Sequence, residues 1–252
     1  MKMTFHQNGT AWEVDLDAGV DVSIAVGGKG SGVRAWGLKA AEVRPYREGG
    51  FTGSVKAGAS VNFNDISFNP HAHGTHTECI GHITPEGEPL LDNPPPAWLL
   101  ATLVSIEPEV RGSDRVVSRE QLKKALSAPV MKAIVLRTLP NPEAKKKADY
   151  SGTNPPYLEP EGVEWLQQQG VEHLLLDLPS VDREEDGGAL AAHKAFWGLP
   201  DRPRPEATIT EFLYVPNQLM DGTYLLNLQV AAFDNDACPS RPVLFPLKRV
   251  QE

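Results

Sequence analysis

The sequence predicts an α/β fold with a mainly parallel central sheet and a smaller added β layer. Segments of strand and helix character alternate from residue 99 onward, which is typical of a sheet covered by helices. The run Leu174-Leu175-Leu176 is apolar at consecutive positions, as expected for a parallel strand buried on both faces. Short runs with period-two alternation in the first third predict the added β layer. The 252 residues show no internal repeat or break in composition, so we expect a single domain, residues 1–252.

The first expected elements are short strands. Residues 13–17 and 20–26 alternate apolar and polar side chains on either side of a glycine-containing turn, which predicts a β-hairpin. Residues 51–55 and 60–66 are two further strand-like runs. The glycine-rich run at residues 27–32 does not open a helix with G-x-G-x-x-G and lacks the Lys-Ser/Thr pair of a P-loop. We therefore interpret this run as a surface loop.

The remaining elements are predicted from residue 99 onward. The expected strands cover residues 99–106, 133–137, 171–177, 207–214, 223–232 and 242–247. Ser118 and Gln121 form a capping box that starts a helix ending at Leu126. A second helix starts at Pro160 and stops at Gly170, and the third covers residues 189–197. Residues 141–156 are polar and proline-rich, so we expect a lid or binding loop there.

Composition and charge exclude several classes of function. The formal net charge of -9 argues against a nucleic-acid-binding surface. No apolar run approaches the ~20 residues of a membrane span, and the N-terminus lacks the apolar core of a signal peptide. Cys79 and Cys238 are the only cysteines, so a disulfide framework is not expected. We expect a cytoplasmic enzyme or binding protein that contacts neither nucleic acid nor a membrane.

The segment from Pro70 to His82 holds four of the chain's seven histidines. On an extended segment His76, Glu78 and His82 point to the same side, because side chains alternate along a strand. Two imidazoles and a carboxylate suit a divalent ion such as zinc or manganese, whereas the alternative interpretation is a solvated polar strand face. His71 and His73 have the opposite parity and can join the same site only if the intervening glycine bends the chain.

Two residues of the second half are further candidates. Glu211 lies between Ile209 and Leu213 on one face of a predicted strand, where a carboxylate is costly unless it is paired or bound to metal. An ordinary buried ion pair is the alternative interpretation. His193 lies on the third predicted helix, where on its own it is interpreted as a surface histidine. His173 and the remaining histidine near the N-terminus have no acidic context and are interpreted as structural or exposed.

The motif Gly74-Thr75-His76-x-Glu78-x-x-x-His82 resembles the H-x-G-T-H-x-D-x-P-x-H signature of the metal-dependent cyclase family, which includes bacterial kynurenine formamidases and isatin hydrolases. The likeness spans most of the chain from residue 60 on and continues, in the family's order, through Asp177-x-Pro179-Ser180-x-Asp182, Ala192-His193-Lys194, Glu211 and Pro239-x-Arg241. The resemblance implies a swivelling β/β/α three-layer fold. It also implies hydrolysis of a small linear or cyclic amide by a metal-bound water, and a homodimer or a higher homo-oligomer.

The resemblance also implies roles for individual residues. His76 and Glu78 match metal ligands, and His82 matches the histidine that acts as general acid/base. His193 and Glu211 match ligands of members that hold a second metal. One or two divalent ions, zinc or manganese, are therefore expected. Aspartates beside a buried strand, such as Asp177 or Asp182, serve either to orient metal-bound histidines or to cap a helix.

The chain departs from the family signature at three places. Ala72 stands where the family has its first ligand, so His71 or His73 must replace that ligand; we favour His71 because it follows a proline and can reach across a one-residue bulge. Glu78 replaces aspartate, which shifts the carboxylate by about a bond length, and Ile80 replaces proline. These departures leave two alternatives open: a family member that binds a ligand without turning it over, and a metal-dependent lyase or dehydratase.

Overall fold

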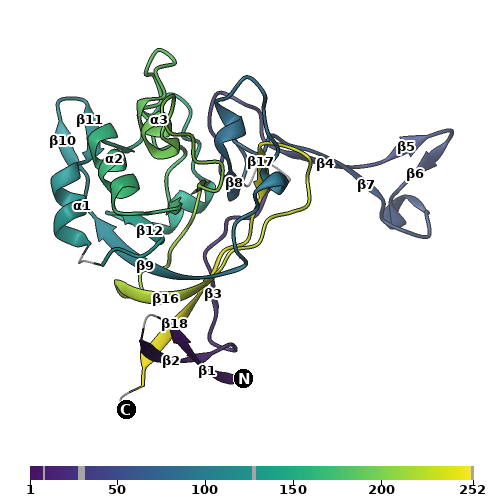
Figure 1. The fold of residues 1–252 in the computed structure, drawn as a ribbon. Helices are drawn as coiled ribbons and strands as arrows, with labels where there is room; N and C mark the ends of the chain where they lie inside the picture. Colours follow the sequence, from purple (N-terminus) through teal and green to yellow (C-terminus); the bar gives the residue numbers. More distant parts are fainter. Residues whose placement is uncertain (8, 28–31, 127–128, 251–252) are drawn as a thin grey trace.

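The structure is a computed structural model that describes residues 1–7, 9–27, 32–126 and 129–250 (Figure 1). Within these residues a mixed sheet of eleven strands runs through the body of the protein. In spatial order its strands are β1 (Lys2–Gln7), β2 (Thr10–Asp15), β18 (Val243–Arg249), β16 (Gly222–Asn227), β9 (Trp98–Ile106), β12 (Ala133–Thr138), β14 (His173–Leu176), β15 (Thr208–Glu211), β8 (His76–Glu78) and β17 (Ala237–Pro239), with β3 (Val20–Asp21) beside β18.

The parallel part of the sheet is its centre. Strands β9, β12, β14 and β15 are parallel neighbours, with Val135 opposite Leu103 on one side and Leu175 on the other. The pairs on both flanks are antiparallel, including β15–β8 and β8–β17. The predicted α/β class is therefore confirmed, and within the large sheet the parallel pairs are those between the four central strands.

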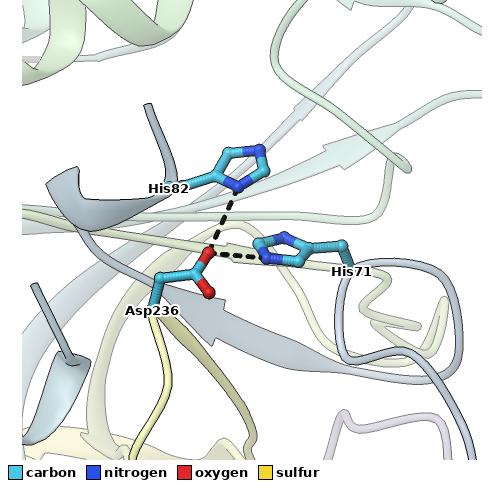
Figure 2. A group of neighbouring side chains, drawn as sticks. All are labelled: His71, His82 and Asp236. Carbon is cyan, nitrogen blue, oxygen red and sulfur yellow. Dashed lines mark hydrogen bonds and ion pairs between the residues drawn. The ribbon is translucent and has the colours of Figure 1, made fainter. Parts of the chain in front are cut away.

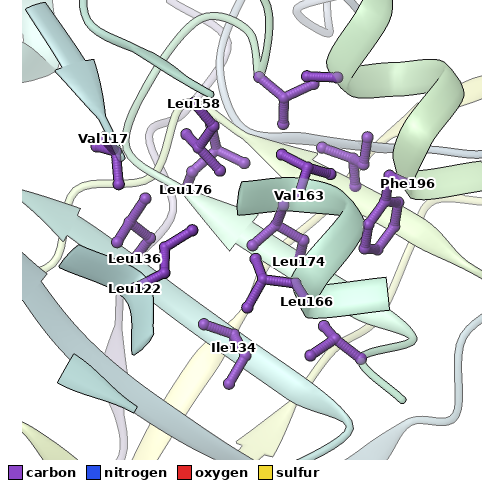
Figure 3. Packing of buried hydrophobic residues seen from close by; sticks show 14 of the residues in the cluster. Val117, Leu122, Ile134, Leu136, Leu158, Val163, Leu166, Leu174, Leu176 and Phe196 are labelled. Atoms are coloured by element: carbon purple, nitrogen blue, oxygen red, sulfur yellow. The ribbon is translucent and has the colours of Figure 1, made fainter. Parts of the chain in front are cut away.

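Three α-helices lie together against the sheet (Figure 1): α1 (Arg119–Ala125), α2 (Pro160–Gln168) and α3 (Ala191–Trp197). Figure 3 shows the larger core under these helices, in which Leu122, Val163, Leu166 and Phe196 pack against Ile134, Leu136, Leu174 and Leu176 of the central strands. The alternate residues of these strands, Val135 and Leu175, belong to a second core on the other face. The central strands are thus buried on both faces, as the apolar leucine run predicts.

The helix boundaries follow local capping signals. The Ser118 hydroxyl accepts a hydrogen bond from the Gln121 amide (3.3 Å), and the Gln121 side chain accepts one from the Ser118 amide (3.0 Å), so the predicted capping box starts α1. Pro160 opens α2 as predicted. Residues 141–156 contain the short 3₁₀ helix η4 (Glu143–Lys147), and the Lys145 ammonium lies 2.7 Å from the Asp177 carboxylate. This ion pair fastens the segment to the sheet.

The N-terminal hairpin prediction is wrong. Strand β2 pairs with β1 and β18, whereas β3 pairs only with β18 and not with β2. Strand β3 takes its ladder hydrogen bonds from the distant C-terminal strand and not from its neighbour in the sequence. The N-terminal strands therefore extend the large sheet itself. Of the glycine-rich run, residues 28–31 lie outside the described residues.

Smaller β elements lie outside the large sheet. A three-stranded sheet consists of β10 (Glu109–Arg111), β11 (Asp114–Val117) and β13 (Tyr157–Leu158). Two short ribbons, β4 (Glu42–Pro45) with β7 (Asn64–Ser67) and β5 (Arg47–Glu48) with β6 (Phe51–Thr52), form an arm that projects from the body (Figure 1). We call residues 42–67 the arm; the strand-like run at residues 51–55 contributes only β6 before the 3₁₀ helix η1 (Val55–Ala57). In the described parts of the chain, no helix is long and apolar enough to cross a membrane.

Candidate metal centre

The candidate site is built around β8 at the edge of the sheet. His76 pairs with Glu211 of β15, and the hydroxyls of Thr77 and Thr210 lie 2.8 Å apart, which fixes the register of the two strands. His76 and Glu78 leave the same face of β8 and are fully buried. The predicted same-face arrangement therefore holds for these two residues.

His82 reaches the site by a different route from the one predicted. The extended segment ends at Glu78, and the 3₁₀ helix η2 (Ile80–His82) turns the chain. Ile80 consequently packs in the core under the helices, and His82 returns so that its Nε2 lies 3.9 Å from Glu78 Oε2. The parity argument is thus wrong for His82, because a turn and not a strand places it. With 31% of its side chain exposed, His82 is the most accessible imidazole of the group.

His71, and not His73, joins the cluster. His71 Nδ1 lies 3.0 Å from Glu78 Oε2. The ring of His73 points elsewhere: its Nδ1 accepts a hydrogen bond from the Asn69 amide (2.9 Å) and its Nε2 lies 2.7 Å from the Lys39 carbonyl. His73 therefore holds the loop together, while His71 supplies a nitrogen to the site.

The bend between the His71–His73 loop and His76 depends on Gly74. Gly74 has a φ of +76°, and a Cβ at this position would lie 2.8 Å from the Ile24 carbonyl oxygen. Only glycine combines this left-handed conformation with so close an approach of another backbone. The glycine bend that the sequence required for His71 is present.

The second half of the chain contributes His193 and Glu211. His193 Nε2 lies 3.1 Å from Glu78 Oε1, and its Nδ1 lies 2.6 Å from Asp182 Oδ2. Asp182 also accepts hydrogen bonds from the amides of Ala192 (2.7 Å) and His193 (3.1 Å), so one carboxylate caps α3 and orients the imidazole. The interpretation of His193 as a surface residue is wrong, because its side chain points inward to Glu78 and Asp182 and is only 3% exposed.

Glu211 lies at the end of β15, 3% exposed. Its Oε2 is 3.5 Å from His76 Nε2. Ile209 packs in the core under the helices, but Leu213 packs in the core on the other face, because Phe212 adopts a positive φ of 55° and turns the chain. The predicted shared face therefore ends at Glu211. Asp177, in contrast to Asp182, pairs with Lys145 and orients no histidine.

Sequence reasoning missed one member of the cluster, Asp236. Its Oδ2 lies 2.8 Å from His71 Nε2 and 3.3 Å from His82 Nδ1 (Figure 2). Asp236 reaches this place because β17 pairs with β8, with Ala237 opposite Glu78. No local pattern predicts such a long-range pairing. The only available signal is that Asp236 stands just before the Pro239-x-Arg241 motif.

The pKa shifts show that the imidazoles and carboxylates of the cluster stabilise one another in their charged forms. Burial alone would lower the pKa of His71, but the carboxylates of Asp236 and Glu78 raise it to about 10. In the same way burial is outweighed at His193, where Asp182 and Glu78 raise the pKa to about 10. Burial works to raise the pKa of Glu78, yet the surrounding imidazoles keep it well below the usual value. Burial and the neighbouring Glu78 charge raise the pKa of Glu211.

The donor atoms fit a divalent metal ion. The ligand atoms of His71, His76 and Glu78 lie within 4.8 Å of one another, as do those of Glu78, His82 and His193. His76 Nε2 and Glu211 Oε1 are buried and have no hydrogen-bond partner among the described residues. Buried polar atoms are costly when unpaired, so these two atoms indicate a ligand that completes them. Imidazole nitrogens and carboxylate oxygens are donors that suit a borderline or hard divalent ion.

A cavity of about 390 Å³ opens beside the donor atoms. Its lining includes His71, His82 and His193 together with an apolar wall of Trp36 and Leu38. The Trp36 indole N–H donates a hydrogen bond to the His71 carbonyl at 3.1 Å, which ties this wall to the histidine loop. A small molecule in the cavity would therefore contact both the apolar wall and the accessible His82.

Fold and donor set together define an α/β protein with a candidate divalent-metal centre beside a small-molecule cavity. A family model described as "Putative cyclase" matches residues 2–183, well over half of the chain. The chain belongs to this cyclase family.

The chain is also similar in sequence to individual relatives and in fold to solved structures. The kynurenine formamidase of Bacillus anthracis is 26% identical over 195 residues, which cover 77% of this chain and 85% of the relative. That of Bacillus cytotoxicus is 27% identical over 193 residues, 75% of this chain and 82% of the relative. An isatin hydrolase bound to the product analogue thioisatinate superimposes with a TM-score of 0.60 at 14% identity, covering 91% of this chain and 92% of that structure. A predicted metal-dependent hydrolase from Bacillus stearothermophilus has a TM-score of 0.59 at 14% identity, covering 90% and 97%. The two structures show the same fold.

Proposed function

We propose that this protein is a metal-dependent hydrolase that cleaves the C–N bond of a small linear or cyclic amide, with His82 as the general acid/base. The observation that carries the proposal is the convergence of buried imidazole and carboxylate donors on Glu78 beside a cavity that exposes His82. The formamidase and isatin hydrolase relatives support the amide as the substrate class.

The donor atoms of His71, His76 and Glu78 lie close together and would hold one ion. His193, whose Nε2 lies 3.1 Å from Glu78 Oε1, and Glu211 would be ligands of a second ion, with Glu78 available to both. Zinc or manganese suits these nitrogen and oxygen donors. A divalent ion bound here would supply an activated water and polarise the substrate carbonyl.

The chain's own residues perform the proton transfer and the binding. His82 is the imidazole of the cluster that a substrate in the cavity can approach most freely, so it can take a proton during attack and return it to the leaving nitrogen. Trp36 and Leu38 offer an apolar wall that fits a compact ring-bearing amide, such as an aryl formamide or a fused cyclic imide.

Cys79 and Cys238 are buried free thiols, which supports a cytoplasmic location.

The test combines metal analysis with a panel of aryl formamides, imides and lactams. We expect stoichiometric zinc or manganese and turnover of at least one panel member. His82→Ala should lower kcat by about 10²–10⁴-fold while metal content is retained. The matched control is His6→Ala, an exposed histidine on β1, which should leave both quantities unchanged.

Each alternative function gives a different result. Absence of stoichiometric metal, or an unchanged kcat for His82→Ala, would contradict the proposal. Stoichiometric metal without turnover of any panel member would indicate a family member that only binds its ligand, a possibility raised by the displaced first ligand. A product formed without incorporation of oxygen from ¹⁸O-labelled water would indicate a lyase or dehydratase.

A further inference from the structure

The carboxylate of Asp236 lies between two imidazoles of the candidate centre (Figure 2). A single oxygen, Oδ2, is 2.8 Å from His71 Nε2 and 3.3 Å from His82 Nδ1. The two rings stack with centroids 4.0 Å apart and an interplanar angle of 27°. One carboxylate therefore contacts both the residue proposed as first metal ligand and the residue proposed as acid/base.

The other nitrogen of each ring faces Glu78. His71 Nδ1 is 3.0 Å and His82 Nε2 is 3.9 Å from Glu78 Oε2. A carboxylate that accepts an N–H from one ring nitrogen fixes the tautomer and leaves the opposite nitrogen free to bind a metal or exchange a proton. In this arrangement Asp236 holds Nε2–H of His71 and Nδ1–H of His82, and the inward nitrogens are the functional ones.

The backbone around Asp236 is held firmly. The Asp236 carbonyl accepts a hydrogen bond from the Cys79 amide (3.1 Å), and the Asn235 carbonyl accepts one from the Leu90 amide (2.9 Å). The Asn235 side chain donates to the Ala237 carbonyl at 2.9 Å. The first two bonds attach the segment before β17 to the chain that follows β8, and the third braces the segment internally, so the carboxylate is held at the edge of the sheet.

From this geometry we infer that Asp236 is a positioning residue that orients His71 and His82, an inference that rests on the proposed function. His71 stands one position away from the place of the family's first ligand, which Ala72 occupies. A metal-binding imidazole is usually oriented by a partner, often a carboxylate, that accepts its other ring N–H. Asp236 provides that partner and at the same time couples the metal ligand to the acid/base.

The experiment compares Asp236→Asn with Asp234→Asn, an exposed aspartate in the same segment. Two measurements need no substrate. The first is Mn²⁺ binding, monitored through the EPR signal of free Mn²⁺, and the second is the electronic spectrum of the Co²⁺-loaded protein. Asp236→Asn should still reach full metal occupancy, but its dissociation constant for Mn²⁺ should be about 10–100-fold higher and its Co²⁺ spectrum should be shifted. Asp234→Asn should match the wild type, and Asp236→Glu should recover part of the affinity.

Two further readouts separate positioning from a merely structural role. In a His71→Ala background, Asp236→Asn should weaken Mn²⁺ binding by less than threefold, because its effect on the metal acts through His71. With an active substrate, Asp236→Asn should lower kcat about 10–100-fold with little change in KM, because His82 loses its orientation.

Two results would overturn the inference. One is an Mn²⁺ affinity and Co²⁺ spectrum of Asp236→Asn that equal those of Asp234→Asn. The other is a folded Asp236→Asn protein that cannot be loaded with metal at any concentration, which would make Asp236 a direct ligand. A wild-type protein that binds Mn²⁺ but turns over no substrate would contradict the proposed function alone, because the metal readouts would still test Asp236.

Discussion

Glu78 lies in the middle of the candidate centre, and three imidazoles approach its two carboxylate oxygens. His71 and His193 lie within 3.1 Å, and His82 within 3.9 Å. A buried carboxylate without partners would be strongly destabilised, so these imidazoles explain why the pKa of Glu78 stays low in spite of its burial. Glu78 replaces the aspartate of the family signature, and both proposed ligand sets converge on it. Its longer side chain reaches all three rings.

Gly74 controls whether His71 can reach Glu78. We predict that Gly74→Ala destabilises the fold by more than about 1 kcal/mol, because the new Cβ would meet the Ile24 carbonyl and the φ of +76° disfavours alanine. Displacement of the loop should also weaken Mn²⁺ binding. The control is Gly87→Ala, which has a φ of +61° but no atom within 4 Å of the added Cβ. Equal Mn²⁺ affinities in the two variants would show that the bend does not position His71.

At the scale of elements, local signals were sufficient for some predictions and not for others. The capping box of α1 and the proline that opens α2 act within a few residues, so the sequence alone predicts both helix starts. Glu211 could be singled out because its strand neighbours are apolar. In contrast, the pairing of β3 with β18 and of β17 with β8 depends on residues far apart in the sequence. The burial of His193 and the presence of Asp236 in the cluster follow from such contacts, and no local pattern contains them.

Strand β14 contains a second kind of buried histidine. His173 is 1% exposed, its Nδ1 lies 2.9 Å from the Thr208 hydroxyl, and burial lowers its pKa to about 4. In the unfolded chain the pKa returns to about 6.5. Between about pH 4 and pH 6.5 the unfolded state therefore binds a proton that the folded state does not bind. This histidine therefore makes the free energy of unfolding fall as the pH drops from about 6.5 towards 4.

We predict that His173→Asn loses this dependence. Urea unfolding at pH 7 and pH 4.5 should show a decrease in stability that is smaller in the variant than in the wild type by about 2 kcal/mol. His6→Asn, which changes an exposed histidine, serves as the control and should behave as the wild type. An identical pH dependence in His173→Asn and wild type would mean that His173 is not excluded from protonation in the folded state.

At the scale of the whole molecule, the arm is the feature that the body does not explain. Among the residues that the structure describes, its strands pair only with each other. Val43 and Ile66, opposite one another on one face, are 44% and 61% exposed. An isolated two-stranded ribbon is at best marginally stable in water, and exposed apolar patches mark interaction surfaces. Residues 42–67 carry three acidic and three basic side chains, although the whole chain has a net charge of -9. A second copy of the arm would therefore meet balanced charges and not a repelling surface.

We propose that the arm packs against a second copy of this chain, which would make the protein a homodimer or a larger homo-oligomer with a self-complementary interface. Light scattering after size-exclusion chromatography should give at least twice the monomer mass for the wild type. The double variant Val43→Ser/Ile66→Ser should shift the protein towards the monomer, because the apolar pair that the interface would bury is removed. Val110→Ser is the control, since Val110 is 78% exposed on β10 and lies outside the arm. A monomeric wild type, or a double variant that keeps the oligomer intact, would refute the arm as the interface.

Because β7 ends at Ser67, four residues before His71, loss of the oligomer should also weaken Mn²⁺ binding. Val110→Ser should leave the Mn²⁺ dissociation constant unchanged.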